Sequence, residues 1–511
     1  MDAFVARSGM RIAATLALLA ALAAAALAGA CNGKSSQLVE ASPDAGVTVE
    51  SGPDAGVVVA GAPDAGTPDA GPALGGPGPW PIANQTFSSA DGLQEAPVVG
   101  TTTDEAQNRW IATNTALYLL RPGEKPRRFT SSDGLHLMDN PALIREDYCG
   151  STAVVPGAAL PPGILTIAGG AAGEVFVGYQ GADEMVGDCS DPAWARHSGK
   201  VDRVRLKPDG TLEVTRFDLA SAGYGMSFWH NRTVYRLVYD HGVEFDQPTH
   251  PHTLYVGTNH GVDLLLPDKY RDPMPGEWSG SPILEWMGDH LHPRVCIQPG
   301  GAPCPHGEGN ERYGDWHGLA IAPDGDLWVA GRWAAGKIRW DPLGPLHWEH
   351  DRTGAEAFSE AFGDPADTNP PVFPVAKEGE VVSLTAVAVT PDGTVWFGNR
   401  AIYADPGERD RGVASYKPGK GFTYYSPFDV GMSETAVQDI VALPDGRVVF
   451  AGPSTGIVFY DPATKRHVAM RAGQGIPDDR VLQLEVDRMV SPPALHVSTA
   501  GGAAAIRVFP K

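Results

Sequence analysis

One two-strand pattern recurs along this chain, and its clearest copy is SLTAVAVTPDGTVWFGNR at residues 383–400. Apolar residues recur at every second or third position in 384–389 and again in 395–397. Such alternation is typical of β-strands, because successive side chains point to opposite faces. Pro391-Asp392-Gly393 between the runs favours a tight turn, since proline fixes φ and glycine accepts positive φ. The segment is therefore predicted to be a β-hairpin.

Related hairpins recur at a spacing typical of propeller blades. FSSADGL at 87–93 returns as FTSSDGL at 129–135, 42 residues later. Seven candidate second strands can be aligned: 109–113, 174–179, 253–258, 326–331, 394–399, 447–452 and 494–499. A third apolar run follows, as at 116–120, 262–266, 336–340, 413–416 and 457–460. The sequence therefore predicts an all-β fold, a seven-bladed β-propeller of four-stranded antiparallel blades.

The two ends of the repeat region complement one another. The last apolar run, 503–509, has no outer strand after it, whereas 85–88 is a spare strand ahead of the first full blade. Pairing the two would complete the last blade and remove an open sheet edge that could template aggregation. We therefore expect the amino- and carboxy-terminal strands to close the ring.

These repeats resemble the two-component-regulator type of β-propeller, which is similar in shape to WD40 and NHL propellers. Its pattern is D-G-L, followed by V-x-x-I-x-x-D-x-x-G-x-[LV]-W-[IV]-G-T-x-x-G-[LV]. Residues 474–487 are the closest copy of the front half and 254–262 of the back half. The resemblance covers about 80–511 with degenerate copies, and it implies a sensor-like ligand domain. One scaffold hosts many activities, so the resemblance does not specify a function.

Composition excludes some functions. The formal charge of −22 argues against nucleic-acid partners and anionic membrane surfaces, because phosphate binding needs clustered Lys and Arg. The sequence contains no Gly-x-Ser-x-Gly, Walker A or His-Glu-x-x-His motif. A nucleophile elbow, a nucleotide site and a zinc-protease site are therefore not indicated, and no cofactor is predicted.

The amino terminus has the features of an export signal. Arg7 and Arg11 precede an Ala/Leu-rich stretch at 12–27, which ends in Leu27-Ala-Gly-Ala-Cys31. This end resembles a bacterial lipobox, in which Cys31 becomes the lipidated first residue, although Ala28-Gly-Ala30 also fits an ordinary A-x-A cleavage site. Cysteine parity favours lipidation, because it leaves four of the five cysteines to pair. No later segment approaches about 20 apolar residues.

A low-complexity segment separates this signal from the repeats. Pro-Asp-Ala-Gly begins at Pro43, Pro53, Pro63 and Pro68, and no aromatic residue occurs in 32–79. Such a segment cannot bury enough apolar surface to offset its ordering entropy, so it is predicted to be a disordered tether. We expect a signal peptide at 1–30, a lipidated cysteine and linker at 31–79, and the propeller at 80–511. The predicted location is the bacterial cell envelope, lipid-anchored at the outer membrane or cell surface.

Connection lengths divide the propeller into two faces. Turns between strands one and two and between three and four of a blade lie on one face; the other connections lie on the opposite face. The first class is predicted to be short: 323–325, 391–393, 444–446, 266–269, 341–344, 417–420 and 461–464. The second class holds the insertions: 136–163, 182–198, 268–315, 351–380 and 400–411. We call these the short-turn face and the long-loop face, and we expect binding on the long-loop face.

Four cysteines lie in the insertions. Cys149 and Cys189 emerge from one blade on one face, and Cys296 and Cys304 share a third insertion. The predicted disulfides are 149–189 and 296–304, although four cysteines allow three connectivities. His290, His292 and His317 near the second pair could instead indicate zinc, but their spacing matches no standard zinc pattern, so no metal is predicted.

The innermost strands can be registered by V-x-x-I. This places seven residues at one equivalent position: Gly100, Thr166, Arg236, Gly318, Ala386, Asp439 and Gln483. If this position faces the tunnel, it offers one guanidinium and one carboxylate. Propellers that resemble lactonases or sugar-acid lyases need a cluster of acids there. Arg236 and Asp439 could contact a polar ligand, or they could form a structural pair or be exposed to solvent.

Two functions remain open. The first is a non-enzymatic, monomeric binding, scaffolding or sensor-like module for a protein, peptide or glycan. Its candidate ligand-binding aromatics on the insertions include Tyr148, Trp194, Trp286 and Trp316, whereas Trp110, Trp328 and Trp396 are predicted to be core. The second is a lactonase-like hydrolase or lyase acting on a polar, carbohydrate-like substrate at the tunnel mouth.

Overall fold

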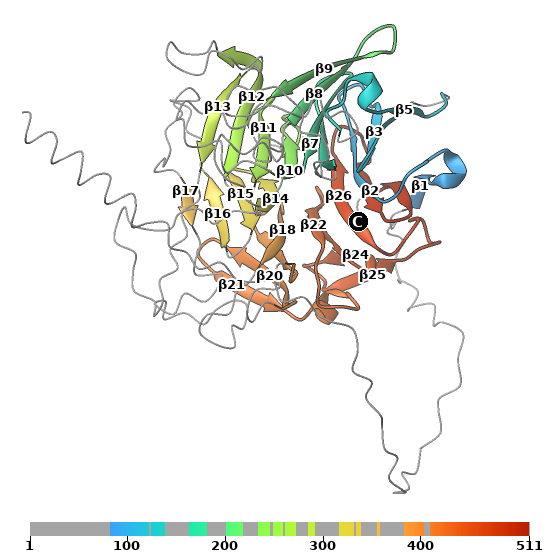
Figure 1. Ribbon diagram of the computed structural model, residues 1–511. Helices are drawn as coiled ribbons and strands as arrows, with labels where there is room; N and C mark the ends of the chain where they lie inside the picture. Colours follow the sequence, from blue (N-terminus) through green and yellow to red (C-terminus); the bar gives the residue numbers. More distant parts are fainter. Residues whose placement is uncertain are drawn as a thin grey trace, which may run out of the picture. The chain divides into compact units, whose positions relative to one another are not determined.

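The computed structural model describes residues 82–121, 124–137, 163–180, 201–217, 233–245, 249–258, 261–271, 285–291, 316–331, 334–338, 355–357, 383–402 and 409–509. Within these residues, 28 strands pair into seven sheets, each with four antiparallel strands. The fold is a seven-bladed β-propeller, as the repeats predict (Figure 1).

Each of the first three blades is a meander of four consecutive strands. Blade 1 contains β2 (Val98–Thr103), β3 (Arg109–Thr113), β4 (Leu117–Leu120) and β5 (Arg127–Phe129). Blade 2 contains β6 (Ile164–Gly169), β7 (Glu174–Tyr179), β8 (Val201–Leu206) and β9 (Leu212–Phe217). Blade 3 contains β10 (Val234–Tyr239), β11 (Leu254–Thr258), β12 (Val262–Arg271) and β13 (Glu285–Leu291).

The next three blades repeat this order. Blade 4 contains β14 (Trp316–Ile321), β15 (Leu327–Gly331), β16 (Ala334–Ile338) and β17 (Ala355–Ala357). Blade 5 contains β18 (Leu384–Val389), β19 (Val395–Asn399), β20 (Gly412–Lys417) and β21 (Gly421–Tyr425). Blade 6 contains β22 (Asp439–Ala442), β23 (Val448–Gly452), β24 (Gly456–Asp461) and β25 (Arg466–Met470). Short 3₁₀ helices include η1 (Ser89–Asp91), η2 (Ser131–Asp133) and η6 (Pro427–Val430).

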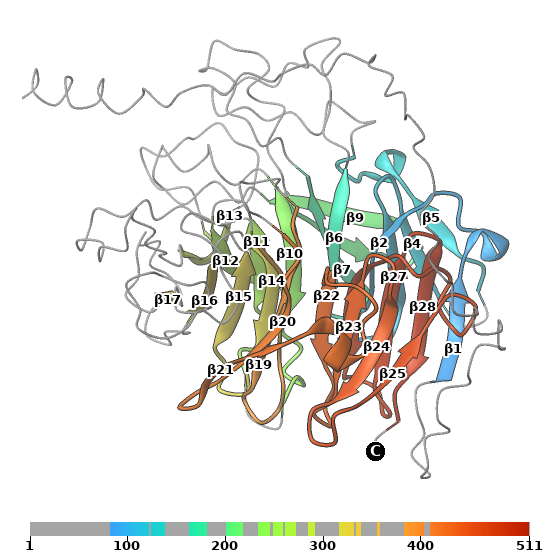
Figure 2. The ribbon, with the colours of Figure 1, turned by 90° about the horizontal axis from the view of Figure 1, so that it is seen from below.

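Blade 7 joins the two ends of the described chain. It contains β26 (Val481–Asp487), β27 (Ala494–Thr499) and β28 (Gly502–Arg507), and its outer strand is β1 (Ile82–Phe87). Gln85 pairs with Ala505 and Phe87 with Ala503, and Figure 2 shows β1 beside β28. The predicted closure is confirmed, with a strand that begins a few residues earlier than expected.

The innermost strands contact one another in chain order around the ring. β2, β6, β10, β14, β18, β22 and β26 each touch the next, and β26 touches β2 (Figure 1). They therefore surround a central tunnel.

The hairpin at 383–400 forms as predicted. β18 and β19 are joined by a turn in which the Gly393 amide donates to the Thr390 carbonyl at 2.8 Å. Gly393 has φ of +75°, a conformation that glycine adopts without a Cβ penalty. The Asp392 carboxylate accepts from the hydroxyls of Thr390 and Thr394, at 2.7 and 3.0 Å. These bonds fix the turn on the short-turn face.

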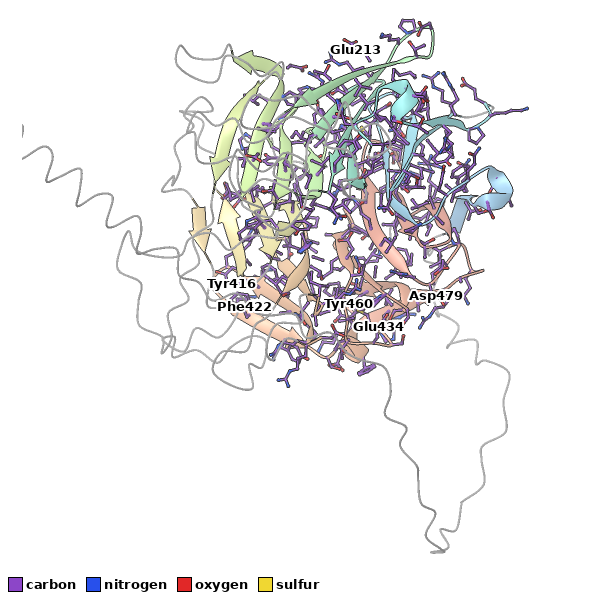
Figure 3. All side chains as sticks on the ribbon, viewed as in Figure 1. Glu213, Tyr416, Phe422, Glu434, Tyr460 and Asp479 are labelled. Carbon is purple, nitrogen blue, oxygen red and sulfur yellow. The ribbon has the colours of Figure 1, made fainter. Side chains whose placement is uncertain are left out.

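The core lies between neighbouring blades. Trp110, Trp328 and Trp396 are buried, which confirms their assignment to the core. Tyr416 and Phe422, labelled in Figure 3, have ring centroids 4.6 Å apart in blade 5, and Tyr416 also contacts Trp328 of blade 4. Each blade therefore packs on its neighbour through aromatic and branched side chains.

The insertion predicted at 268–315 was partly wrong. β12 continues to Arg271, so 266–269 is strand rather than turn. β13 then pairs with β12 inside the expected insertion, with Asp263 opposite His290. Strand three therefore ends at Arg271 and strand four begins at Glu285, instead of being joined by the predicted turn at 266–269. In blade 4, β17 likewise lies inside the insertion predicted at 351–380.

The short-turn face is not short in blade 3. The connection from β10 to β11 spans 240–253, whereas blade 5 needs only 390–394 for the same turn. This longer connection was missed in the sequence, and it reaches the central tunnel.

Several predictions lie outside the described residues. They include the signal and tether at 1–79, Cys31, and the four cysteines of the proposed disulfides. The chain divides into units Met1–Gly75 and Gly76–Lys511, and all described residues belong to the second. Within the described part, no helix has the length and apolar character to span a membrane.

Candidate functional site: the central tunnel

Six of the seven innermost strands carry a bulge near the long-loop end, and Gln438 stands at the equivalent place just before β22. In β10, for example, the pairing with β11 shifts between Val234 and Arg236, so that Tyr235 is extra. A bulge bends a strand and re-aims the displaced side chain. The residues at this position share the same place in their blades but differ in side chain: Val99, Leu165, Tyr235, His317, Thr385, Gln438 and Leu482.

The position after each bulge is the one registered from the sequence. Arg236 pairs with Gly257 and Asp439 with Ala451. The other five partners are also glycine, alanine or serine, at 112, 178, 330, 398 and 498. The register predicted for these seven residues is confirmed, and small partners leave room for large side chains at this level.

Arg236 and Asp439 form an ion pair between blades 3 and 6. The Arg236 Nη1 atom lies 2.9 Å from Asp439 Oδ2, and Nη2 donates to the Leu484 carbonyl at 3.1 Å. The Leu484 amide donates to the same carboxylate oxygen at 2.8 Å. The pair therefore links three blades, and the interpretation of these residues as a structural pair agrees with the geometry.

A cavity of about 140 Å³ extends from this ion pair toward the short-turn face. Most of the residues that line it are apolar and come from blades 3 to 7, including Leu237, Leu319, Val387, Ile440 and Leu484, although polar atoms contribute as much of the exposed lining as apolar atoms do. Blade 2 contributes Ala168 and Gly169. The tunnel is therefore mixed in character, with polar groups at a few positions only.

The short-turn end of the cavity is lined by His241, Glu244 and Arg488. Glu244 accepts from the backbone amides of His241 and Val243, and burial together with the charge of Asp240 raises its pKa to about 7. Burial lowers the pKa of the His241 imidazole. Arg488 Nη2 donates to the Ala442 carbonyl at 2.6 Å.

A second acid of the cavity, Glu485, lies on the wall formed by β26. The Thr102 hydroxyl of blade 1 donates to its Oε1 at 2.5 Å. Burial raises the pKa of Glu485 to about 8, and Asp487 and Asp439 act in the same direction. The carboxyl is therefore largely protonated at neutral pH and can both donate and accept a hydrogen bond.

This arrangement differs from the lactonase-like site considered from the sequence. Such a site needs several carboxylates or histidines converging on a divalent ion. Asp439 is engaged by Arg236 and Glu485 by Thr102. Among the described residues, no group of three or more His, Cys, Asp or Glu side chains is placed to share a metal ion.

The predicted ligand-binding residues are scattered. Trp286 and His290 lie on β13, the outer strand of blade 3, and not on a loop. Trp316 is fully buried at the start of β14, so its placement as a surface aromatic was wrong. His317 follows it on the innermost strand, 4.2 Å from the Tyr235 ring between centroids, and burial lowers its pKa to about 3. Tyr148, Trp194 and His292 are outside the described residues.

Four functional candidates in the cavity were missed: His241, Glu244, Glu485 and Arg488. Only Glu485 left a usable signal. Two positions after the registered residues come Thr102, Ala168, Val238, Ala320, Ala388, Val441 and Glu485, so Glu485 is the ionisable member of an otherwise small or apolar ring. The other three lie on connections whose path across the tunnel mouth has no sequence signature.

The long-loop edge of blade 5 exposes apolar side chains. Phe428 is 60% exposed, Tyr424 41% and Ile402 38%. They come from η6, from the end of β21 and from the connection after β19. Among the described residues, the remaining large exposed hydrophobic side chain is Val243, on the opposite face.

Comparison with known proteins finds distant structural likenesses only. No protein-family model and no curated protein matches the chain. Among solved structures, the chain is similar to the extracellular domain of a putative hybrid two-component system from B. thetaiotaomicron, with TM-score 0.44 and 12% identity. That match covers 84% of this chain and 42% of the other, so the chain spans less than half of that protein. YCF48 bound to D1 peptide (TM-score 0.42) and a mitotic checkpoint complex chain (0.44) match at 10% identity over 84% of this chain and 96% of theirs.

Proposed function

We propose that this propeller is a non-enzymatic binding or scaffolding module whose long-loop face engages a protein or peptide partner. In this proposal, lipidated Cys31 and the 31–79 linker hold it at the cell envelope. The supporting observation is the apolar group Ile402, Tyr424 and Phe428 on the long-loop edge of blade 5. Exposed aromatics are effective binding anchors, because they bury large areas with little loss of conformational freedom.

A polypeptide partner fits this edge better than a glycan does. Ile402 adds an exposed aliphatic side chain to the two aromatics of this edge, and an aliphatic side chain gains from apolar contact rather than from sugar hydroxyls. The insertion 400–411 and η6 both belong to blade 5, so the edge is continuous with a predicted binding loop.

The enzymatic alternative has less support, because its candidate residues Arg236 and Asp439 bind each other. Arg236 and Asp439 neutralise each other, and a substrate would have to separate them at the cost of a partly buried charge. We therefore do not assign them to substrate binding.

A random 12-residue peptide display library panned on the purified full chain tests the proposal. We expect an enriched peptide whose affinity falls by about 10-fold or more in Phe428→Glu, because a charge is placed in an apolar contact. Val243→Glu on the short-turn face is the matched control and should leave the affinity unchanged.

Peptides that bind both variants equally, or enrichment of none above a bare-support control, would contradict the proposed surface. Saccharide binding on a glycan array that is lost in Phe428→Glu would replace the polypeptide partner by a glycan. Mass spectrometry of the mature amino terminus tests the anchor separately, since an unmodified Cys31 or cleavage elsewhere contradicts it.

A further inference from the structure

Three residues that line the central cavity each keep a buried nitrogen without a hydrogen-bond partner. Among the described residues of the cavity, these atoms are Arg236 Nε, His241 Nδ1 and Arg488 Nε. His241 Nδ1 lies 3.6 Å from Glu105 Oε1, beyond hydrogen-bond distance. Two of these unpaired atoms, on His241 and Arg488, belong to the short-turn end of the cavity.

Unpaired buried donors are costly, about 1–3 kcal/mol each and more when the group is charged. A cavity that collects several of them is therefore built to hold something that accepts hydrogen bonds. Solvent is one such occupant, and a ligand with acceptor oxygens is another.

The charge around the cavity favours an anion. Arg236 is neutralised by Asp439. Arg488 makes no ion pair among the described residues; its contacts are the Ala442 carbonyl and the Phe245 ring, 5.8 Å from the guanidinium carbon. Glu244 is the acid whose charge acts on Arg488, and burial raises its pKa to about 7. Two further acids lie at this end: Asp487, which precedes Arg488 in the chain, and Glu105, beside His241. Among the described residues, the Arg488 guanidinium therefore remains without an ion pair of its own.

Size and wall chemistry restrict the anion. A dry cavity of about 150 Å³ accommodates a benzene-sized molecule, so 140 Å³ allows about six non-hydrogen atoms. Leu319, Val387 and Ile440 offer apolar contact and little hydrogen bonding through their side chains. A strongly hydrated multivalent anion would lose its water here without replacement.

We propose that the central cavity binds a short monocarboxylate with an apolar tail. Its carboxylate meets Arg488 and His241 at the short-turn end, and its tail lies among the branched side chains of β14, β18 and β22. Water completes the hydrogen bonding of Arg236 at the other end. This site is independent of the long-loop face, so the two proposals can fail separately.

Calorimetry and thermal unfolding of the full chain with propionate, butyrate and benzoate test the site. Uncharged butyramide and cationic butylammonium are matched in size and serve as controls. We expect butyrate to bind with Kd on the order of 1 mM or tighter and to raise Tm, because a ligand of about six atoms rarely gains more than a few kcal/mol. Benzoate is larger than the cavity allows and should bind more weakly than butyrate. Butyramide should bind at least about 10-fold more weakly, since it cannot pair with a guanidinium charge.

Two variants locate the binding. Arg488→Met should abolish carboxylate binding, whereas Arg480→Met, an exposed arginine just before β26, should leave it unchanged. If Arg488→Met does not fold, Ala388→Val narrows the same cavity and keeps every charge, and it should weaken binding about 10-fold with unchanged circular dichroism.

If none of the acids binds, the cavity holds only solvent. Equal affinities for butyrate and butyramide would show that the cavity does not recognise the carboxylate charge. Butyrate binding that survives both Arg488→Met and Ala388→Val would place the carboxylate elsewhere. Each of these results overturns the proposal.

Discussion

Two seams between neighbouring blades are filled in opposite ways. Between blades 5 and 6, Trp396 packs against Phe450 and Tyr460, with ring centroids 5.8 and 6.0 Å apart. Between blades 7 and 1, hydroxyl groups meet polar groups near the tunnel: Thr101 with Ser498 at 2.9 Å, Thr102 with Glu485 at 2.5 Å and Thr103 with Asp487 at 2.8 Å. Phe87, Ile111 and Tyr118 add an apolar portion to the same seam.

The difference follows from how each seam forms. Blades 5 and 6 are consecutive, so a short connection already brings them together. Their apolar packing is joined by few hydrogen bonds, such as that from the Thr385 hydroxyl to the Val437 carbonyl at 2.6 Å. The seam between blades 7 and 1 joins residues 383 apart in sequence at Thr102 and Glu485. Directional hydrogen bonds specify one alignment, whereas apolar contact tolerates sliding, and we infer that the polar seam fixes the register of closure.

Removing β1 should have the largest effect, because it tests the closure itself. A chain that begins after Ser88 leaves β28 as an unpaired edge and removes Phe87 from the seam. We expect aggregation or loss of cooperative thermal unfolding, measured by light scattering and calorimetry. A chain that begins at Trp80 is the control. A soluble truncated protein with an unchanged Tm would show that the ring closes without this strand.

Trp396→Ala should have the next largest effect, because it opens the apolar seam. Deleting a buried tryptophan removes apolar contact and leaves a cavity, which costs about 3–5 kcal/mol in free energy of unfolding. Chemical denaturation measures this loss, and Trp396→Phe should recover a large part of it. A cost below about 1 kcal/mol would mean that the seam relaxes around the gap.

Glu485→Gln should have the smallest effect, visible mainly in its pH dependence. The pKa of Glu485 is raised to about 8 in the folded protein, above its ordinary value of 4.5. The unfolded state therefore loses its proton first, so this group's stabilising contribution is complete below about pH 4.5 and is lost as pH rises toward 8. Thr102, Arg236, Asp439 and Asp487 surround the group and remain in the variant.

The measurement for Glu485→Gln is Tm across pH 5 to 9. Wild type and variant should be similar near pH 5, and the variant should be relatively more stable near pH 8.5, because glutamine has no proton to lose. Parallel Tm curves across this range would contradict the raised pKa. Thr102 can donate to the glutamine oxygen as it does to the carboxyl, so the seam is otherwise preserved.

Most of the fold could be predicted from short sequence patterns. The turn at 390–394 contains all the residues whose hydrogen bonds form it, so residues 383–400 could be assigned without the rest of the chain. The spare strand ahead of blade 1 followed from counting strands. Outer strands β13 and β17 were hidden inside insertions, because an outer strand that packs on one side only needs little apolar periodicity.

The site was harder to predict because it depends on distant partners. Trp316 was predicted to be an aromatic residue on an insertion. It stands two residues before the registered residue of its strand, as Val98 and Leu384 do in theirs, and all three are buried. Glu485 has an altered pKa only because ring closure places Thr102 and apolar walls around it. Arg488 and His241 meet at the tunnel mouth through connections with no recognisable pattern.

At the bulges of the innermost strands, the identity of the side chain can vary without a change in strand pairing. Because each displaced residue is extra to the ladder, its replacement changes no strand pairing, and the strand remains anchored by the residue that follows. Tyr235, His317 and Gln438 already occupy three of these places with three different chemistries. A lineage of such propellers can therefore vary the chemistry at these positions while every blade keeps its strand pairing.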